Sequence, residues 1–165
     1  MNKTKKLTLS ALFGAMIFVT TLFVQIPSPL GMGYAHIGDA FIYLAACVLP
    51  CHYAIFASAV GACLADAIVF PAYIIPTLII KSLLVLAFSD KGEKIITPRN
   101  ITAAILGGVI GVVGYFVAEW IMYASIYTAL ANVVFTIAQP IVSFVVYLVV
   151  GYGLDKVNFK KRFLR

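Results

Sequence analysis

Long apolar runs dominate this chain, and its basic side chains are almost all confined to three short segments at the ends of those runs. Eleven of the twelve Lys and Arg residues lie at positions 3–6, 91–99 and 156–165. Loops on the cytoplasmic side of a membrane carry an excess of Lys and Arg. The pattern therefore predicts that all three segments lie on that side, which requires an even number of crossings between each pair.

The composition supports a membrane location. Hydrophobic residues make up 63% of the 165 residues and charged residues only 11%, whereas a soluble domain carries about 25% charged residues. Continuous apolar runs, rather than alternating ones, favour transmembrane helices over an outer-membrane barrel. The formal net charge of +6 is explained by topology and by contact with anionic lipid, so no nucleic-acid partner is expected.

These runs predict an all-α integral membrane protein, a bundle of six transmembrane helices in a single domain (residues 1–165) with both termini cytoplasmic. We expect helices at about residues 7–25, 39–49, 53–70, 75–88, 101–123 and 129–154. The first run is longer than the core of a secretory signal and no cleavage site follows it, so it is interpreted as a transmembrane helix.

A polar, glycine-flanked loop precedes the second expected helix. Residues 33–39 read Gly-Tyr-Ala-His-Ile-Gly-Asp. Helix 39–49 is short for a crossing, so we expect either that it tilts or that the preceding loop folds into the bundle. Asp39 stands where an N-cap belongs and would accept hydrogen bonds from free backbone N–H groups. Tyr34 and His36 are candidates for ligand contact, because functional contacts concentrate in loops held by a rigid scaffold.

Asp66 and Lys81 lie at equal distances from the turn that joins helices 53–70 and 75–88. In an antiparallel hairpin they would lie at similar depth, about 10 Å from the turn at about 1.5 Å per residue. Charges buried in hydrocarbon usually find a partner. The spacing predicts either an ion pair that fixes the hairpin or a direct contact with a ligand or with the inserted loop.

Two later helices also carry polar side chains. Glu119 shares a helix face with Tyr115 and Tyr123, four residues away on either side. Helix 129–154 carries a polar stripe formed by Asn132, Thr136, Gln139 and Ser143. These groups are expected either to hydrogen-bond between helices or to bind a ligand. Glu119 and Asn132 both lie toward the outer end, which favours a ligand role for the pair.

Several chemistries have no matching motif. The chain has no Walker A sequence, no GxSxG or HExxH motif, and no CxxC spacing among Cys47, Cys51 and Cys63. We therefore expect no catalytic residues, no metal site and no cofactor.

Small residues on the first helix form two overlapping pairs at four-residue spacing, Ser10 with Gly14 and Ala11 with Ala15. Such pairs let another helix approach closely in lipid. The spacing alone leaves open whether that helix belongs to the same bundle or to a partner.

Taken together, the six short helices and three motifs resemble the S component, the substrate-binding membrane subunit, of energy-coupling factor (ECF) transporters. The motifs are Gly-Tyr-x-His-x-Gly-Asp at 33–39, Gly-x3-Ala-Asp at 61–66 and Pro-Thr-Leu-Ile-Ile-Lys at 76–81. The likeness covers nearly the whole chain. It is strongest to the hydroxymethylpyrimidine and pyridoxine subgroup, with the riboflavin-type group nearby.

The resemblance implies a role for each group of residues. The segment that contains Ala11, Gly14 and Ala15 matches the family's alanine-x-x-x-alanine motif, which docks on the membrane T component. The ligand would lie near the outer face, with the contact residues Tyr34, His36, Glu119, Tyr123, Asn132 and Gln139. Asp39, Asp66 and Lys81 would form an ion pair or support the site. ATP hydrolysis would belong to two separate ATPase subunits.

We therefore expect a non-enzymatic transport subunit in a bacterial plasma membrane that captures a B-vitamin or precursor outside, with hydroxymethylpyrimidine or pyridoxine as the best candidate. Two alternatives remain open. An autonomous secondary transporter or channel would use Asp66, Lys81 and Glu119 as an ion relay. In a non-transporting assembly protein, the same polar residues would only hold helices together.

Overall fold

The computed structural model describes residues 1–30 and 33–164. Residues 31–32 of the expected outer loop and residue 165 of the basic tail lie outside the described residues. The helices are α1 (Lys3–Phe23), α2 (Gly38–Val48), α3 (Cys51–Val69), α4 (Ile74–Leu86), α5 (Pro98–Tyr123), α6 (Ile126–Thr136) and α7 (Ala138–Lys156). Strands β1 (Gln25–Pro27) and β2 (Tyr34–His36) pair as an antiparallel hairpin, and short turns occupy Pro71–Tyr73 and Lys160–Leu164.

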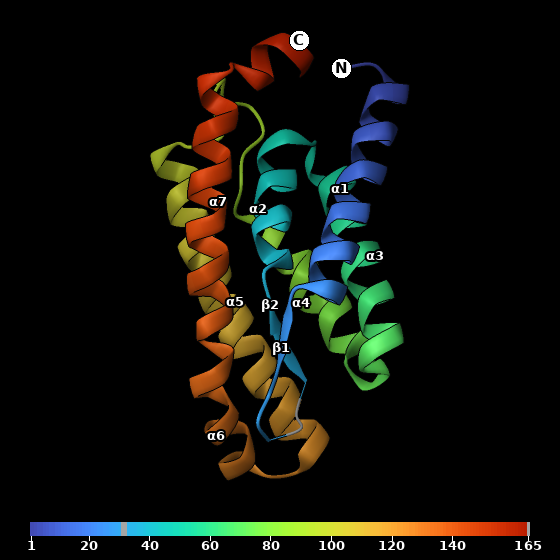
Figure 1. Ribbon diagram of the computed structural model, residues 1–165, viewed down its shortest axis with the longest axis vertical. Helices are drawn as coiled ribbons and strands as arrows, with labels where there is room; N and C mark the ends of the chain where they lie inside the picture. Colours follow the sequence, from blue (N-terminus) through green and yellow to red (C-terminus); the bar gives the residue numbers. More distant parts are fainter. Residues whose placement is uncertain (31–32, 165) are drawn as a thin grey trace.

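By length and composition, four segments of the described part can cross a membrane: 3–23, 51–69, 98–123 and 126–156. Two shorter apolar helical segments, 38–48 and 71–86, accompany them. Both termini lie at one end of the molecule, called here the terminal end (Figure 1). The fold is therefore that of a helical membrane protein with several spans, while a count of six crossings stays a prediction.

Local sequence explains where several helices begin. The side chain of Asn2 accepts a hydrogen bond from the backbone N–H of Lys5 at 2.9 Å, which caps α1 four residues before its expected start. Thr97 caps α5 in the same way, and Pro98 occupies the first turn, where a missing N–H costs nothing.

The segment expected as one helix at 129–154 is divided at Ile137 into α6 and α7. Pro140 explains the interruption, because it has no N–H to donate to the carbonyl oxygen of Thr136 and its ring crowds that oxygen. The break leaves Gln139 in the first turn of α7, where it is buried and faces the centre of the bundle.

The centre of the bundle is filled by α2 and, beneath it, by the β1–β2 hairpin (Figure 1). Every residue of α2 except Phe41 is buried, and Ala35 and His36 of β2 are buried as well. Helices α1 and α3 lie on one side of this column and α5 and α7 on the other. Of the two arrangements expected for so short a helix, a tilt or an inserted loop, the structure shows the inserted loop: the hairpin folds into the bundle and lies beneath α2 at its centre.

Helices α1 and α3 approach closely through two glycines. A Cβ placed on Gly61 of α3 would lie 2.5 Å from the carbonyl oxygen of Gly14 on α1, closer than a Cβ atom can approach. Gly14 therefore packs inside its own bundle. Ala11 and Ala15 of the same helix are exposed.

Polar contacts fasten the loop between α4 and α5 to the end of α7. The carboxylate of Asp155 accepts hydrogen bonds from the backbone N–H groups of Ile95 and Ile96, at 2.7 and 2.9 Å. Nearby, Lys160 donates to the carbonyl oxygen of Asp90 at 2.8 Å. These contacts bring the second and third basic segments together at the terminal end.

Candidate functional site

A polar cavity lies beside β2 at the end of the bundle opposite the termini. Its walls come from the hairpin and from helices α3 to α7: Gly33, Tyr34, Ala35, His36, Asp66, Tyr73, Thr77, Tyr115, Glu119, Asn132, Phe135, Thr136 and Gln139. The cavity measures about 30 Å³, on a scale where one water molecule needs about 10–15 Å³. In this conformation the cavity is closed to any ring-sized compound.

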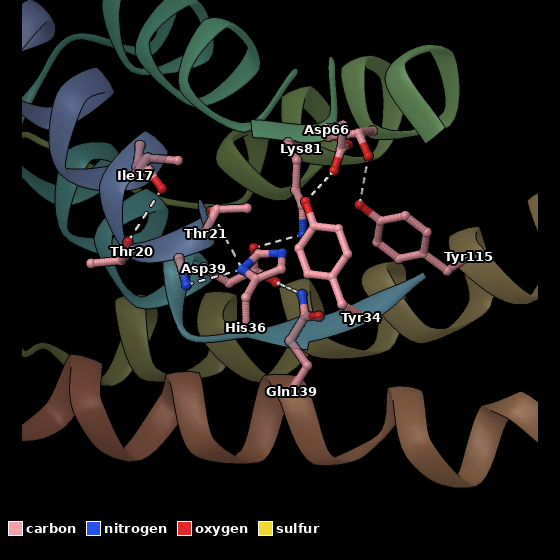
Figure 2. Close-up of polar contacts among 12 residues, drawn as sticks. Ile17, Thr20, Thr21, Tyr34, His36, Asp39, Asp66, Lys81, Tyr115 and Gln139 are labelled. Carbon is pink, nitrogen blue, oxygen red and sulfur yellow. Dashed lines mark hydrogen bonds and ion pairs between the residues drawn. The ribbon is translucent and has the colours of Figure 1, made fainter. Parts of the chain in front are cut away.

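A buried ion pair lies directly behind this cavity. Lys81 is completely buried, and its Nζ lies 2.6 Å from Oδ1 of Asp39 (Figure 2). The second oxygen of Asp39 accepts a hydrogen bond from Nε2 of Gln139 at 2.7 Å. These contacts join α2, α4 and α7 in one network.

Two predictions about these charges are wrong. Lys81 pairs with Asp39 and not with Asp66, because the inserted loop brings the start of α2 to the depth of Lys81. Asp39 does not cap α2, since its carboxylate is used by Lys81 and Gln139. Asp66 contacts the inserted loop instead, which was the alternative to the ion pair.

The contact between Asp66 and the hairpin is a hydrogen bond from a tyrosine. Tyr34 Oη donates to Oδ1 of Asp66 at 2.5 Å, so β2 is attached to α3 (Figure 2). A second polar contact, between the hydroxyls of Thr77 and Tyr115 at 2.9 Å, joins α4 to α5 beside it. The hairpin strand therefore forms one wall of the cavity and is held there by a carboxylate.

His36 holds the junction between the hairpin and α2. Its Nδ1 accepts a hydrogen bond from the backbone N–H of Gly38 at 3.0 Å, which satisfies a free donor in the first turn of α2. Gly38 is needed at this point, because a Cβ there would collide with the hydroxyl of Thr21 and with the His36 ring. Since Nδ1 acts as the acceptor, the imidazole is neutral in this arrangement.

A second chain of hydrogen bonds closes the far side of the cavity. Oε1 of Glu119 accepts from Nδ2 of Asn132 at 2.7 Å and from Oη of Tyr73 at 3.1 Å. Asn132 in turn accepts from Oγ of Ser28, just beyond β1, at 2.7 Å. Oε2 of Glu119 is buried and has no hydrogen-bond partner among residues 1–30 and 33–164. The hairpin is thus attached to α6 as well as to α3.

The cavity brings together most of the residues that the sequence singled out for ligand contact. Five of the six predicted residues line it: Tyr34, His36, Glu119, Asn132 and Gln139. Tyr123 does not line it; this residue ends α5 and is 36% exposed.

Two more lining residues, Tyr115 and Thr136, belong to the polar groups that the sequence placed beside Glu119 and Asn132. Tyr73, Thr77 and Phe135 also line the cavity and were not considered for ligand contact. Helical spacing could have pointed to Thr77, which lies four residues before Lys81. Tyr73 lies in the short turn at 71–73, where helical periodicity gives no signal.

An apolar groove runs between α1 and α3 on the outside of the bundle. It is lined by Ser10, Ala11, Gly14, Ala15, Phe18, Phe56, Ala57, Val60, Gly61 and Leu64. Its floor is the close contact between Gly14 and Gly61. The small residues of α1 therefore have two different environments. Gly14 packs against α3 of its own bundle, and Ala11 and Ala15 line the exposed groove.

Comparison with known proteins agrees with the resemblance. Residues 1–156 match the family model described as ECF-type riboflavin transporter, S component. The chain belongs to this S component family. A protein of Pyrococcus woesei, described as an uncharacterized protein in gap 3′ region, is 32% identical to this S component over 148 residues, which are 88% of this chain and 95% of the relative. S components are membrane transport subunits rather than enzymes.

Proposed function

We propose that this S component captures a small B-vitamin or vitamin precursor in the cavity beside the hairpin and passes it inward after docking on a T component. In this proposal the chain crosses the plasma membrane six times, and two separate ATPase subunits supply the energy. The observation that carries the proposal is a small cavity lined by many polar side chains at one end of a strongly apolar bundle.

The distribution of charge supports the orientation. All three basic segments gather at the terminal end. The β1–β2 hairpin and α6, which line the cavity, lie toward the other end (Figure 1). Because Lys and Arg mark the cytoplasmic side, the cavity faces outward. Such an arrangement suits a protein that takes its ligand from outside.

Ligand entry requires the hairpin to move. The cavity is too small for a ring in the closed conformation. The hairpin is the part of the wall that is not helical, and side-chain hydrogen bonds attach it to the helices. Ser28 and Tyr34 each contribute one of these bonds. Opening the hairpin would break both bonds, at a net cost of about 1 kcal/mol for the bond from Ser28 and about 1.5–3 kcal/mol for the bond from Tyr34 to the Asp66 carboxylate.

Docking would use the groove between α1 and α3. Its small, apolar lining admits a partner helix at close range, and the exposed Ala11 and Ala15 lie in it. A tryptophan at either position would fill the groove, which shares no lining residue with the cavity.

Two measurements on the whole chain test the proposal. Gentle purification followed by mass spectrometry of the extracted small molecules should identify a bound vitamin or precursor. Ala15→Trp should abolish uptake in cells that contain the coupling subunits while leaving ligand binding intact. Leu12→Trp, at an exposed position of α1 outside the groove, is the matched control and should leave both unchanged. Transport by the purified chain alone in liposomes would refute the proposal in favour of an autonomous transporter.

A further inference from the structure

Two carboxylates face the same cavity, and each has an oxygen that the fold leaves unused. Asp66 is 5% exposed and Glu119 is 3% exposed, and both line the cavity. One oxygen of each accepts a hydrogen bond from a tyrosine, Tyr34 or Tyr73. The other oxygen of each is buried without a hydrogen-bond partner in residues 1–30 and 33–164. Buried acceptors are nearly always satisfied by protein, water or ligand, so each of these oxygens can accept from a donor on a ligand that takes the place of water.

The protein supplies no charge to balance these carboxylates inside the cavity. Among the described residues that line it, none is Lys or Arg. The nearest buried cation, Lys81, is already committed to Asp39 at 2.6 Å and does not line the cavity. His36 accepts a hydrogen bond through Nδ1 and is neutral in this arrangement. With both carboxylates ionised, the lining holds two negative charges and, among the described residues, no Lys or Arg side chain.

A ligand that brings positive charge would supply both the hydrogen-bond donors and the positive charge that the cavity lining lacks among the described residues. A protonated ring nitrogen or ammonium group donates hydrogen bonds and offsets the carboxylate charge, and such charge-assisted bonds are about twice as strong as neutral ones. A phosphate group has the opposite effect, since it adds like charge and only accepts from this lining. An uncharged ring would satisfy the free acceptors without balancing the charge.

We infer that the cavity selects a nitrogen base, a compound with a protonatable ring nitrogen or amino group that donates to Asp66 and Glu119, and that it rejects phosphorylated compounds. The inference rests on the proposed function, because it names the ligand class of that same cavity. Glu119 and Asp66 then determine specificity, while Tyr34, Tyr73 and Asn132 hold them in position.

Binding to the full-length chain in lipid nanodiscs, followed by calorimetry, tests the inference with defined probes. The bases are 4-amino-5-hydroxymethyl-2-methylpyrimidine and pyridoxine, each compared with its own phosphate ester, and riboflavin is the uncharged ring. We expect at least one base to bind and its phosphate ester to bind about 100-fold more weakly. Glu119→Gln and Asp66→Asn keep the side-chain shape and should each weaken the binding of the base about tenfold.

Glu93→Gln is the matched control, since Glu93 lies half-exposed at the terminal end, paired with Lys161. It should leave binding unchanged. Equal binding of a base and its phosphate ester would overturn the inference. Unchanged affinity in both cavity variants, with unfolding temperatures near that of the unaltered chain, would overturn it as well.

The outcomes also separate this inference from the proposed function. Tight binding of riboflavin that does not depend on Asp66 and Glu119 would overturn the inference and leave the proposed function standing. Failure of all the probes to bind, with no small molecule carried through purification, would overturn both. If the cavity variants do not fold, the comparison of each base with its ester on the unaltered chain still decides.

Discussion

The ion pair between Lys81 and Asp39 gives the sharpest test of the structure, because the sequence alone favoured a different partner. Lys81→Met removes the cation and leaves Asp39 buried with only Gln139 as a donor. Breaking a buried pair from one side costs about 3–5 kcal/mol. For a chain of this size, each kcal/mol lowers the unfolding temperature by about 2–4 °C, so we expect a fall of about 10 °C.

A second substitution then identifies the partner. Lys81→Met combined with Asp39→Asn removes both charges and keeps an acceptor for Gln139, so most of the lost stability should return. Lys81→Met combined with Asp66→Asn is the matched control and should show no recovery, since Asp66 is held by Tyr34. The assay is the loss of helical circular dichroism on heating in a mild detergent. Recovery with Asp66→Asn and none with Asp39→Asn would refute the pairing.

Two further predictions concern packing and the terminal end. Gly61→Ala should destabilise the bundle by about 1–3 kcal/mol, because its Cβ meets the carbonyl of Gly14. Gly111→Ala is the control, because its Cβ meets nothing within 4 Å, and it should be neutral or stabilising by up to about 1 kcal/mol. If the two substitutions change the thermal unfolding temperature equally, the close contact between Gly61 and Gly14 is contradicted. Asp155→Leu leaves two backbone N–H groups at 95–96 without their acceptor. Each unpaired group should lower the free energy of unfolding by about 1–3 kcal/mol. Hydrogen exchange should then rise in this loop, and unchanged protection would count against the role of Asp155.

Much of the cavity could be predicted because its residues lie on regular helices or in one conspicuous loop. Glu119 and Asn132 were grouped because both lie near the same end of the bundle, and in the structure their side chains are 2.7 Å apart. Tyr34 and His36 stood out as polar residues between glycines. In each case, the position along the chain fixed the approximate depth in the bundle.

The partners of the charges could not be predicted in the same way, because they depend on how deep the loop between α1 and α2 enters the bundle. A loop lying outside would leave Asp39 at the helix end as a cap and Asp66 beside Lys81. The hairpin enters instead and carries Asp39 to Lys81, while Tyr34 takes Asp66. Tyr123 does not line the cavity. It is the last residue of α5, and the chain turns at Ala124 with a left-handed backbone, φ 51°.

The hydrogen bonds that close the hairpin use the same carboxylates that a ligand would use, so closure and binding should be coupled. Ser28 attaches the hairpin to Asn132, and Asn132 donates to Glu119. A ligand that contacts Glu119 lies against this chain of bonds, so the hairpin should re-form its bond to Asn132 over the ligand, in a cavity wider than the empty one. Weakening the attachment should therefore shorten the lifetime of the complex.

Ser28→Ala removes the hydroxyl that donates to Asn132 and leaves the cavity lining unchanged. A net loss of about 1 kcal/mol predicts dissociation about fivefold faster. The rate can be followed by stopped-flow mixing with an excess of unlabelled ligand, using the compound that co-purifies with the chain. Ser82→Ala is the matched control, because its hydroxyl donates to the carbonyl oxygen of Leu78 in its own helix, on the outside of α4. Equal dissociation rates for Ser28→Ala and the unaltered chain would show that ligand escapes by a route other than the hairpin.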